Sequence, residues 1–325
     1  MKRSLAFITL AAFAVAISFA APYKAELKIA SSTSLSHTYN AGAQYFAKLV
    51  TERSGGRITF KLYPDGQLGK GERELLEAIQ QGSIDMYVGS TGPLGGFAPS
   101  VQILDIPFLF RDYVHVDKVL DGPIGQALLA DLDKVQMKGL AFWENGFRNL
   151  TNSKKVIKTP EDAKGLKIRT MENPVHIQAW KTAGVNPTPM AWGEVYGALQ
   201  QGVIDGQENP VAVILQVKVY EVQKQLALTQ HVYSPAVLIM SARRWNQLPK
   251  EDQEIILQAA REGAAYQRKL GRDNEEQMLA ELQKNGVTVT RDVNKEAWVA
   301  AMKPAFESFS AQFGKDKIDA ILNTK

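Results

Sequence analysis

Two polar side chains lie just after predicted strands, where they could bind a small anion. The apolar run Leu166–Ile168 predicts a strand that ends on Arg169. A second predicted strand, Val203–Asp205, leads into a segment that contains Asn209. Ligands of open α/β sheets bind beyond the carboxyl ends of strands, and a guanidinium can hold a carboxylate through two parallel hydrogen bonds. Taken alone, the two residues favour plainer roles, as a surface arginine and as a turn residue before Pro210.

Motifs for catalysis are absent from the sequence. The segment Gly69-Lys70-Gly71 lacks the third glycine of a dinucleotide-binding loop, and neither HExxH nor GxSxG occurs. The chain has no cysteine, which excludes disulfides, Cys-ligated zinc and a cysteine nucleophile. The four histidines are scattered without ligand spacing: His37, His115, His176 and His231. We therefore expect no enzyme, no metal site and no cofactor.

The elements that must position a binding site alternate between strand and helix patterns, which predicts an α/β fold. The first half of the chain gives predicted strands at 27–31, 58–62, 84–88 and 139–143, with predicted helices at 38–52, 71–81, 114–120 and 124–134. In the central stretch we predict a Pro-rich turn at 186–189 and a short helix from Trp192 to Gln201. Gly202 can supply the left-handed residue after that helix.

Two segments of the chain echo each other. The sequence AIQQGSID at 78–85 is similar to ALQQGVID at 198–205, and each predicts a helix end, a glycine cap and a strand start. The match is too short to prove duplication, but it suggests two lobes that each contain such a unit. Two α/β lobes whose strand ends face each other make a cleft, which is a preferred place for a small ligand.

Two predicted crossings connect the lobes. The first is Glu144–Arg148, and the second is a break at Ser234-Pro235 between strands at 226–233 and 236–241. A helical run without proline follows at Pro249–Asn285, roughly 55 Å long if it is continuous. The sequence also allows a break in it at Gly271. A strand at 287–290 and two C-terminal helices complete the chain.

The N-terminus has the features of a secretory signal. Lys2 and Arg3 precede the apolar run Leu5–Phe19, and small residues flank a cleavage site after Ala20. We predict a signal peptide over residues 1–20, with an uncleaved anchor as the alternative. The full chain is 45% hydrophobic and 22% charged, which is typical of a globular protein. Loss of Lys2 and Arg3 lowers the net charge by two, from +4 to +2, which is too small to suggest nucleic acid.

Three motifs in the central stretch occur in a fixed order. They are GLKIR at 165–169, NPTPMAWGEVYGALQQG at 186–202 and IDGQENP at 204–210. With these, and with LYPDGQLG at 62–69 and VYEVQK at 219–224, the chain resembles the extracytoplasmic solute receptors of tripartite ATP-independent periplasmic (TRAP) transporters, of the C4-dicarboxylate-binding type. The resemblance implies a two-lobed periplasmic-binding-protein fold with a ligand cleft between the lobes and a long helix that spans both.

The resemblance also assigns candidate ligand contacts. The arginine of the GLKIR motif makes the salt bridge to the ligand carboxylate in the family, which implies this role for Arg169. A second ligand-contacting arginine corresponds to Arg148, whose alternative role is a structural ion pair at the crossing. Trp192 replaces an aromatic residue that lies under the ligand, with core packing as the alternative, and Asn209 would hydrogen-bond the ligand. The contacts expected from lobe one are Ser32, His37, Glu72 and Ser90.

We therefore predict a periplasmic solute-binding protein that captures a small carboxylate, either a dicarboxylate, a sugar acid or a keto acid. It would close by hinge motion and deliver the ligand to the membrane permease subunits of a TRAP transporter. We predict lobe one over 21–145, with 235–260 returning to it, lobe two over 146–234, and the end of the spanning helix with the C-terminal helices over 261–325. We expect a monomer. The alternatives are a sensory or ABC-type receptor for organic acids and a periplasmic enzyme that acts on a carboxylate.

Overall fold

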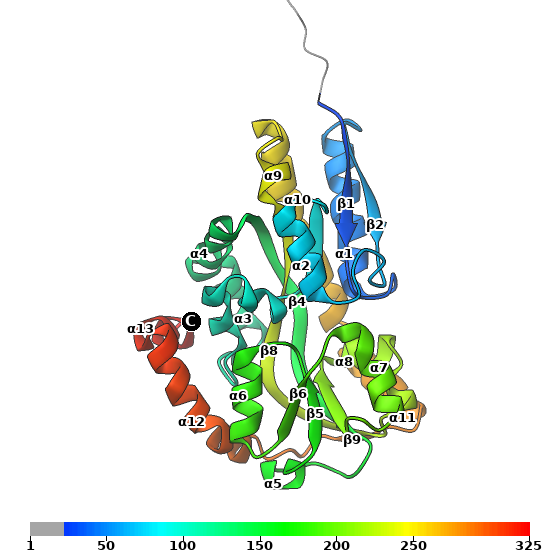
Figure 1. The fold of residues 1–325 in the computed structure, drawn as a ribbon, viewed down its shortest axis with the longest axis vertical. Helices are drawn as coiled ribbons and strands as arrows, with labels where there is room; N and C mark the ends of the chain where they lie inside the picture. Colours follow the sequence, from blue (N-terminus) through cyan, green and yellow to red (C-terminus); the bar gives the residue numbers. More distant parts are fainter. Residues whose placement is uncertain (1–22) are drawn as a thin grey trace, which may run out of the picture.

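The structure, a computed structural model, describes residues 23–325, so the predicted signal peptide at 1–20 lies outside the described residues. Two long strands, β4 (Met137–Asn152) and β8 (Gln225–Ser241), run side by side through the whole molecule and connect an upper and a lower lobe (Figure 1). They lie at the centre of one nine-stranded sheet with the order β2-β1-β3-β8-β4-β7-β5-β6, and β9 pairs with β8. The predicted two-lobed α/β fold is confirmed.

The upper lobe, lobe one, holds the N-terminal strands. Its parallel strands are β1 (Ala25–Ala30), β2 (Ile58–Tyr63) and β3 (Met86–Ser90). The helices of the first half of the chain are α1 (Thr38–Arg53), α2 (Glu72–Gln81), α3 (Tyr113–Asp121) and α4 (Pro123–Asp131). Short 3-10 helices connect them at η1 (Pro93–Gly96), η2 (Pro99–Asp105) and η3 (Leu132–Val135). After β8 the chain returns through α9 (Ala242–Trp245) and α10 (Lys250–Arg272).

The lower lobe, lobe two, contains the central stretch of the sequence. Its strands are β5 (Lys167–Thr170), β6 (Asn186–Pro189), β7 (Gly206–Asn209) and β9 (Thr288–Thr290). Its helices are α5 (Pro160–Ala163), α6 (Pro174–Thr182), α7 (Trp192–Gln200), α8 (Val211–Gln216), the 3-10 helix η4 (Val219–Glu221) and α11 (Glu275–Lys284). The two predicted C-terminal helices are α12 (Lys295–Phe313) and α13 (Lys315–Leu322), which lie along one side of the molecule (Figure 1).

The two echoing segments have equivalent places in the two lobes. Gly82 ends α2 at φ 78°, and Gly202 follows α7 at φ 68°, so both glycines adopt the left-handed conformation that favours glycine. Each unit ends on an aspartate whose Oδ2 accepts a hydrogen bond from a backbone N–H of the neighbouring parallel strand. The distance is 2.9 Å from Asp85 to Lys28 N and 2.9 Å from Asp205 to Lys167 N. The resulting strands β3 and β7 pair antiparallel with β8 and β4, respectively.

Three predicted boundaries differ from the structure. Residues 186–189 were predicted as a turn but form the edge strand β6, which tolerates Pro187 and Pro189 because only one side of it pairs. The predicted break at Ser234-Pro235 is wrong, because β8 continues through it. Arg169 lies inside β5 instead of after it. Both long strands shift register near Glu144 and Gly146, close to the predicted lobe limits, and those limits stay a prediction.

The long helical run is divided in two. Helix α10 packs on α1 and β4, α11 packs on α8, and Asp273 and Asn274 separate the two helices. The break lies two residues beyond the one that the sequence allowed at Gly271. Together the helices extend from lobe one to lobe two, as the resemblance implied.

Candidate functional site

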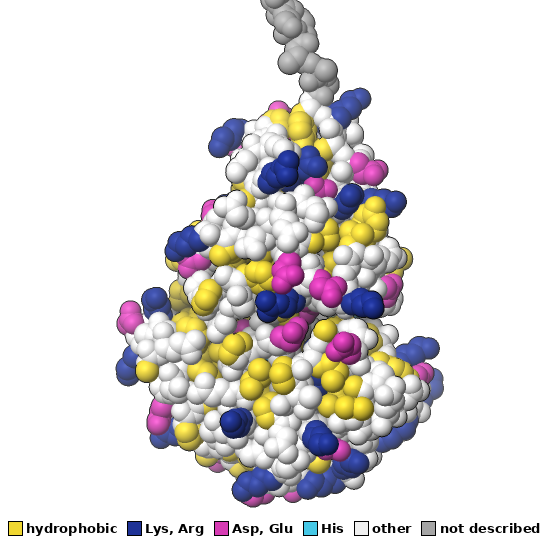
Figure 2. All heavy atoms as spheres, in the orientation of Figure 1, with side chains coloured by type: hydrophobic (Ala, Val, Ile, Leu, Met, Phe, Trp, Pro, Cys, Tyr) yellow, Lys and Arg dark blue, Asp and Glu magenta, His cyan; other side chains and the backbone are white. Residues whose placement is uncertain are grey.

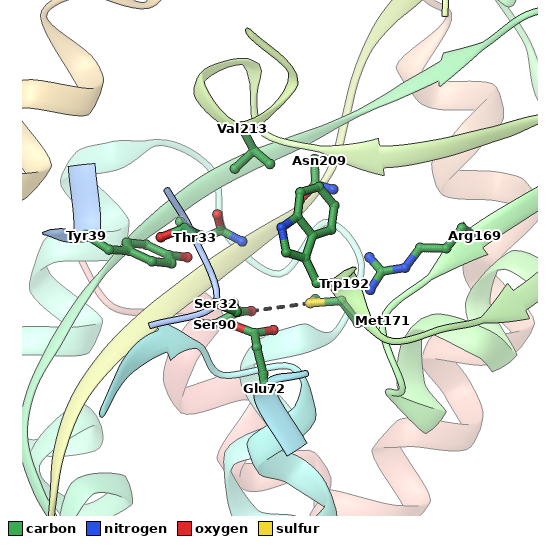
Figure 3. A pocket seen from close by; sticks show the side chains of 11 residues that line it. Ser32, Thr33, Tyr39, Glu72, Ser90, Arg169, Met171, Trp192, Asn209 and Val213 are labelled. Atoms are coloured by element: carbon green, nitrogen blue, oxygen red, sulfur yellow. Dashed lines mark hydrogen bonds between the residues drawn. The ribbon is translucent and has the colours of Figure 1, made fainter. Parts of the chain in front are cut away.

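A small cavity lies between the lobes at the carboxyl ends of the strands (Figure 3). Lobe one and lobe two contribute opposite walls, and Asn145 of β4 lies between them. The cavity brings together six of the eight predicted contacts: Arg169, Asn209, Trp192, Ser32, Glu72 and Ser90. Arg148 and His37 are not among its lining residues. The remaining lining residues are Thr33, Tyr39, Asn145, Met171 and Val213.

Arg169 is held by one edge of its guanidinium. Its Nε and Nη2 both donate to the carbonyl oxygen of Met190, at 3.0 and 2.6 Å, and its Cζ lies 5.5 Å from the ring centroid of Trp192. Within residues 23–325 its Nη1 has no hydrogen-bond partner, so the edge formed by Nη1 and Nη2 remains free. Burial and then the nearby Arg148 lower the pKa of Arg169 to about 10, which leaves it cationic at neutral pH.

Glu72 faces Arg169 from the opposite wall of the cavity (Figure 3). It is the first residue of α2, and its Oε1 accepts hydrogen bonds from the Tyr87 hydroxyl and from Ser90 N, both at 2.9 Å. Its Oε2 accepts no hydrogen bond from the described part of the chain. Burial raises the pKa of the Glu72 carboxyl, while the bonds from Ser90 and Tyr87 act in the opposite direction.

The other predicted contacts are fixed by neighbouring elements. Trp192 begins α7 and lies half-buried over the Arg169 guanidinium. Asn209 ends β7, where its amide donates to Gln207 Oε1. Ser90 ends β3, and its hydroxyl lies 3.3 Å from Met171 Sδ, which is a contact between the lobes. Ser32 completes the lobe-one wall in the loop after β1.

Arg148 forms a buried ion pair. Its Nε and Nη2 donate to the two carboxylate oxygens of Glu208, with 2.8 Å between Nη2 and Oε1, and both side chains are fully buried. Burial alone would raise the pKa of Glu208, but Arg148 and His231 hold it well below its usual range. The Nη1 of Arg148 is buried without a partner among the residues that the structure describes. The geometry matches the structural alternative, and a ligand contact by Arg148 stays a prediction.

His37 has a structural position at the start of α1. Its Nδ1 accepts a hydrogen bond from Tyr39 N at 3.2 Å, which caps the helix, and its ring packs edge-on against Tyr39. Burial lowers the pKa of His37 to about 3, so the ring is neutral at neutral pH. The side chain stands behind Tyr39, and Tyr39 is the residue that lines the cavity.

The lining residues that the sequence did not predict are Thr33, Tyr39, Asn145, Met171 and Val213. Tyr39 lies in the first turn of the helix predicted at 38–52, and Asn145 lies in the segment that was predicted only as a crossing. Asn145 Oδ1 is buried without a hydrogen-bond partner in residues 23–325. Over the same residues no cluster of three or more His, Cys, Asp or Glu could hold a metal ion.

The lobes meet at the mouth of the cavity. A Cβ atom added to Gly193 of α7 would lie 2.8 Å from the carbonyl oxygen of Lys70, and one added to Gly71 would lie 3.3 Å from Ala191 Cβ. The residues before α2 and those at the start of α7 therefore touch across the cleft. The structure shows a closed arrangement, in which a ligand would be surrounded on both sides.

Comparison with known proteins identifies relatives along nearly the whole chain. The model of the family described as bacterial extracellular solute-binding protein, family 7, matches residues 29–312. A solute-binding protein of Verminephrobacter eiseniae is 46% identical over 295 residues, which cover 91% of this chain and 88% of the relative.

Two solved structures are similar in fold and in sequence. A TRAP periplasmic solute-binding protein from Polaromonas sp. JS666, bound to D-erythronate, has a TM-score of 0.91 and 46% identity over 93% of this chain and 99% of its own. One from Bordetella bronchispeptica, with density interpreted as pantoate, has a TM-score of 0.91 and 44% identity over 93% of this chain and 100% of its own.

Proposed function

The chain belongs to family 7 of the bacterial extracellular solute-binding proteins, as a receptor of the TRAP type, and we propose that it captures its small carboxylate ligand end-on at Arg169. The observation that carries the proposal is the free Nη1–Nη2 edge of a buried, cationic guanidinium in the cavity between the lobes. Such an edge matches the two oxygens of a carboxylate. Trp192 orients the guanidinium, and Asn209 adds a hydrogen bond beside it.

The ligands of the similar structures support this proposal. D-erythronate and pantoate each carry one carboxylate, and both relatives share more than two-fifths of their residues with this chain. We propose that lobe one closes over the bound acid through hinge motion at the β4 and β8 crossings. Closure would be a shift of population toward a state with better ligand contacts.

The delivery step also belongs to the proposal. We propose that the protein acts as a monomer in the periplasm after cleavage of its signal peptide, and that it hands the ligand to the permease subunits of a TRAP transporter. In the part of the chain from residue 23 onward, no helix is both long and apolar enough to cross a membrane. Charged side chains of both signs are interspersed on the visible face of the molecule (Figure 2), in keeping with its small net charge. The family is one of solute receptors, and we propose no catalysis.

Substitution of Arg169 tests the anchor. We expect Arg169→Ala to weaken carboxylate binding by at least about 100-fold, because a carboxylate would then be buried without its cation. Isothermal titration calorimetry with a panel of sugar acids, keto acids and dicarboxylates measures the loss.

The matched control for this substitution is Arg243→Ala, which removes an exposed arginine in α9. It should leave affinity unchanged, and circular dichroism should show that both variants are folded. Full affinity in a folded Arg169→Ala variant would refute the anchor.

A further inference from the structure

The charges that line the cavity are nearly balanced. Of its eleven lining residues, Arg169 is the one cation and Glu72 the one acid. Arg148 lies nearby, but its charge is compensated by the two oxygens of Glu208. Arg169 is therefore the one counter-charge that the lining offers to a carboxylate, and a second carboxylate would be buried with Glu72 and no further cation, which is strongly unfavourable.

The wall opposite Arg169 offers hydrogen-bond acceptors. Glu72 Oε2 and the Tyr39 hydroxyl have no hydrogen-bond partner within residues 23–325, and both residues line the cavity. Asn145 Oδ1 is buried and also without a partner in that range. A carboxylate has no donor for Glu72 Oε2 or Asn145 Oδ1, whereas each alcohol O–H of a polyhydroxy chain has one, and the Tyr39 hydroxyl can pair with either kind of group. Acceptors that a bound ligand encloses without a donor are costly, so these two oxygens select a ligand that brings donors.

We propose that this receptor takes a short hydroxylated monocarboxylate, with the carboxylate on Arg169 and the hydroxyl groups on Glu72, Tyr39 and Asn145, and that it rejects dicarboxylates of equal length. The inference rests on the proposed function, because it assumes that a carboxylate binds at Arg169.

Matched pairs of acids test the inference by isothermal titration calorimetry on the mature chain. The first pair is D-erythronate and meso-tartrate. D-erythronate ends in an alcohol group where meso-tartrate has a second carboxylate. The second pair is D-galactonate and galactarate, and erythritol serves as the ligand with no carboxylate. We expect the monocarboxylate of at least one pair to bind at least about 100-fold more tightly than its dicarboxylate, because Glu72 Oε2 and Asn145 Oδ1 cannot pair with carboxylate oxygens.

A charge-removing variant tests the part played by Glu72. Glu72→Gln keeps an oxygen that can accept from Ser90 N and Tyr87, but it removes the negative charge. The preference for the monocarboxylate should fall by about tenfold or more in this variant. Glu74→Gln removes the same charge from the exposed first turn of α2 and should leave the preference unchanged. If Glu72→Gln leaves the preference at its wild-type value, Glu72 does not select the ligand.

The outcomes separate this inference from the proposed function. If acids bind but neither monocarboxylate binds more tightly than its dicarboxylate partner, the substrate class is wrong while carboxylate capture stands. If no acid binds, or if erythritol binds as tightly as D-erythronate, carboxylate capture at Arg169 is itself overturned.

Discussion

At the scale of single residues, the group on one edge of a guanidinium decides what the other edge can do. Arg169 and Arg148 both donate hydrogen bonds from Nε and Nη2 to oxygen atoms of the protein. For Arg169 that oxygen belongs to the neutral carbonyl of Met190, so the side chain keeps its full charge for a ligand. For Arg148 it belongs to the Glu208 carboxylate, so the charge is already compensated. Two arginines that lie close together thus have different capacities to bind an anion.

Substitution of Arg148 or Glu208 should lower the stability of the protein more than its affinity for the ligand. Arg148→Met leaves the Glu208 carboxylate buried without its cation, and we expect the free energy of unfolding to fall by about 3–5 kcal/mol. Urea unfolding measures this fall for Arg148→Met, for Glu208→Gln and for the double variant. The double variant should lose less than the sum of the two single losses, because one interaction is removed in all three.

Ligand titration of the same variants distinguishes the two roles of Arg148. A structural pair predicts similar ligand affinities for folded Arg148→Met and Glu208→Gln, because neither changes the cavity lining. A much weaker affinity in Arg148→Met than in Glu208→Gln would show that the guanidinium contacts the ligand, as the family resemblance implied.

The sequence predicted the site residues that lie in motifs and missed those that distant packing brings to the cavity. Arg169 and Asn209 could be found because each is tied to a strand end within a recognisable motif. Tyr39 lines the cavity because of the way α1 packs against the sheet, and His37, two residues earlier, is turned away to cap that helix. No local sequence pattern shows which of these two residues lines the cavity, because the cavity forms only when distant parts of the chain pack together.

At the scale of elements, helices α2 and α7 meet the cleft as a related pair. Each begins at the mouth of the cavity and ends in a left-handed glycine followed by a strand of the sheet. The echo at 78–85 and 198–205 predicted this correspondence, because glycine caps and strand starts are encoded locally. The length of β8 and the strand β6 could not be predicted in the same way. Pro235 lies in β8 beside a register shift, and Pro187 and Pro189 lie in the edge strand β6. Strands tolerate proline at such positions.

Contact between the lobes at Gly193 predicts that a single methyl group hinders closure. A Cβ atom at Gly193 would approach Lys70 O to 2.8 Å, which is closer than packing allows, and only the closed state contains this contact. We expect Gly193→Ala to weaken ligand affinity by about tenfold, from a strain of about 1–2 kcal/mol. Thermal unfolding without ligand should not be lowered, because alanine favours the helix and the open state has no clash.

Gly197 provides the matched control for this prediction. It lies one turn later in α7, and a Cβ atom there would meet nothing within 4 Å. Gly197→Ala should therefore raise stability by about 0.5–1 kcal/mol and leave affinity unchanged. Equal affinities of both alanine variants would mean that the helix does not approach Lys70 in the bound state.

At the scale of the whole molecule, the proposed capture requires the lobes to exchange between an open and a closed arrangement. The chain has no cysteine, so an engineered pair would be its only disulfide. Gly71 and Ala191 precede α2 and α7 on opposite sides of the cleft, and the Cβ···Cβ distance for a residue at 71 would be 3.3 Å. Disulfides have Cβ···Cβ distances of about 3.5–4.5 Å, so a small adjustment suffices. The extended backbone at Gly71, with φ −130° and ψ 159°, accepts a cysteine without strain.

Oxidation of the double variant Gly71→Cys/Ala191→Cys should therefore lock the cleft. When the bond forms with a bound acid present, the ligand should remain through gel filtration and be released by a reductant. When it forms without ligand, the association rate measured by stopped flow should fall by at least about 100-fold, because entry would require the mouth to open. Each single cysteine variant should bind as the wild type does under both conditions. If thiol titration shows two free cysteines after oxidation with saturating ligand, the mouth does not close on the bound acid, and the hinge mechanism fails whatever the identity of the ligand.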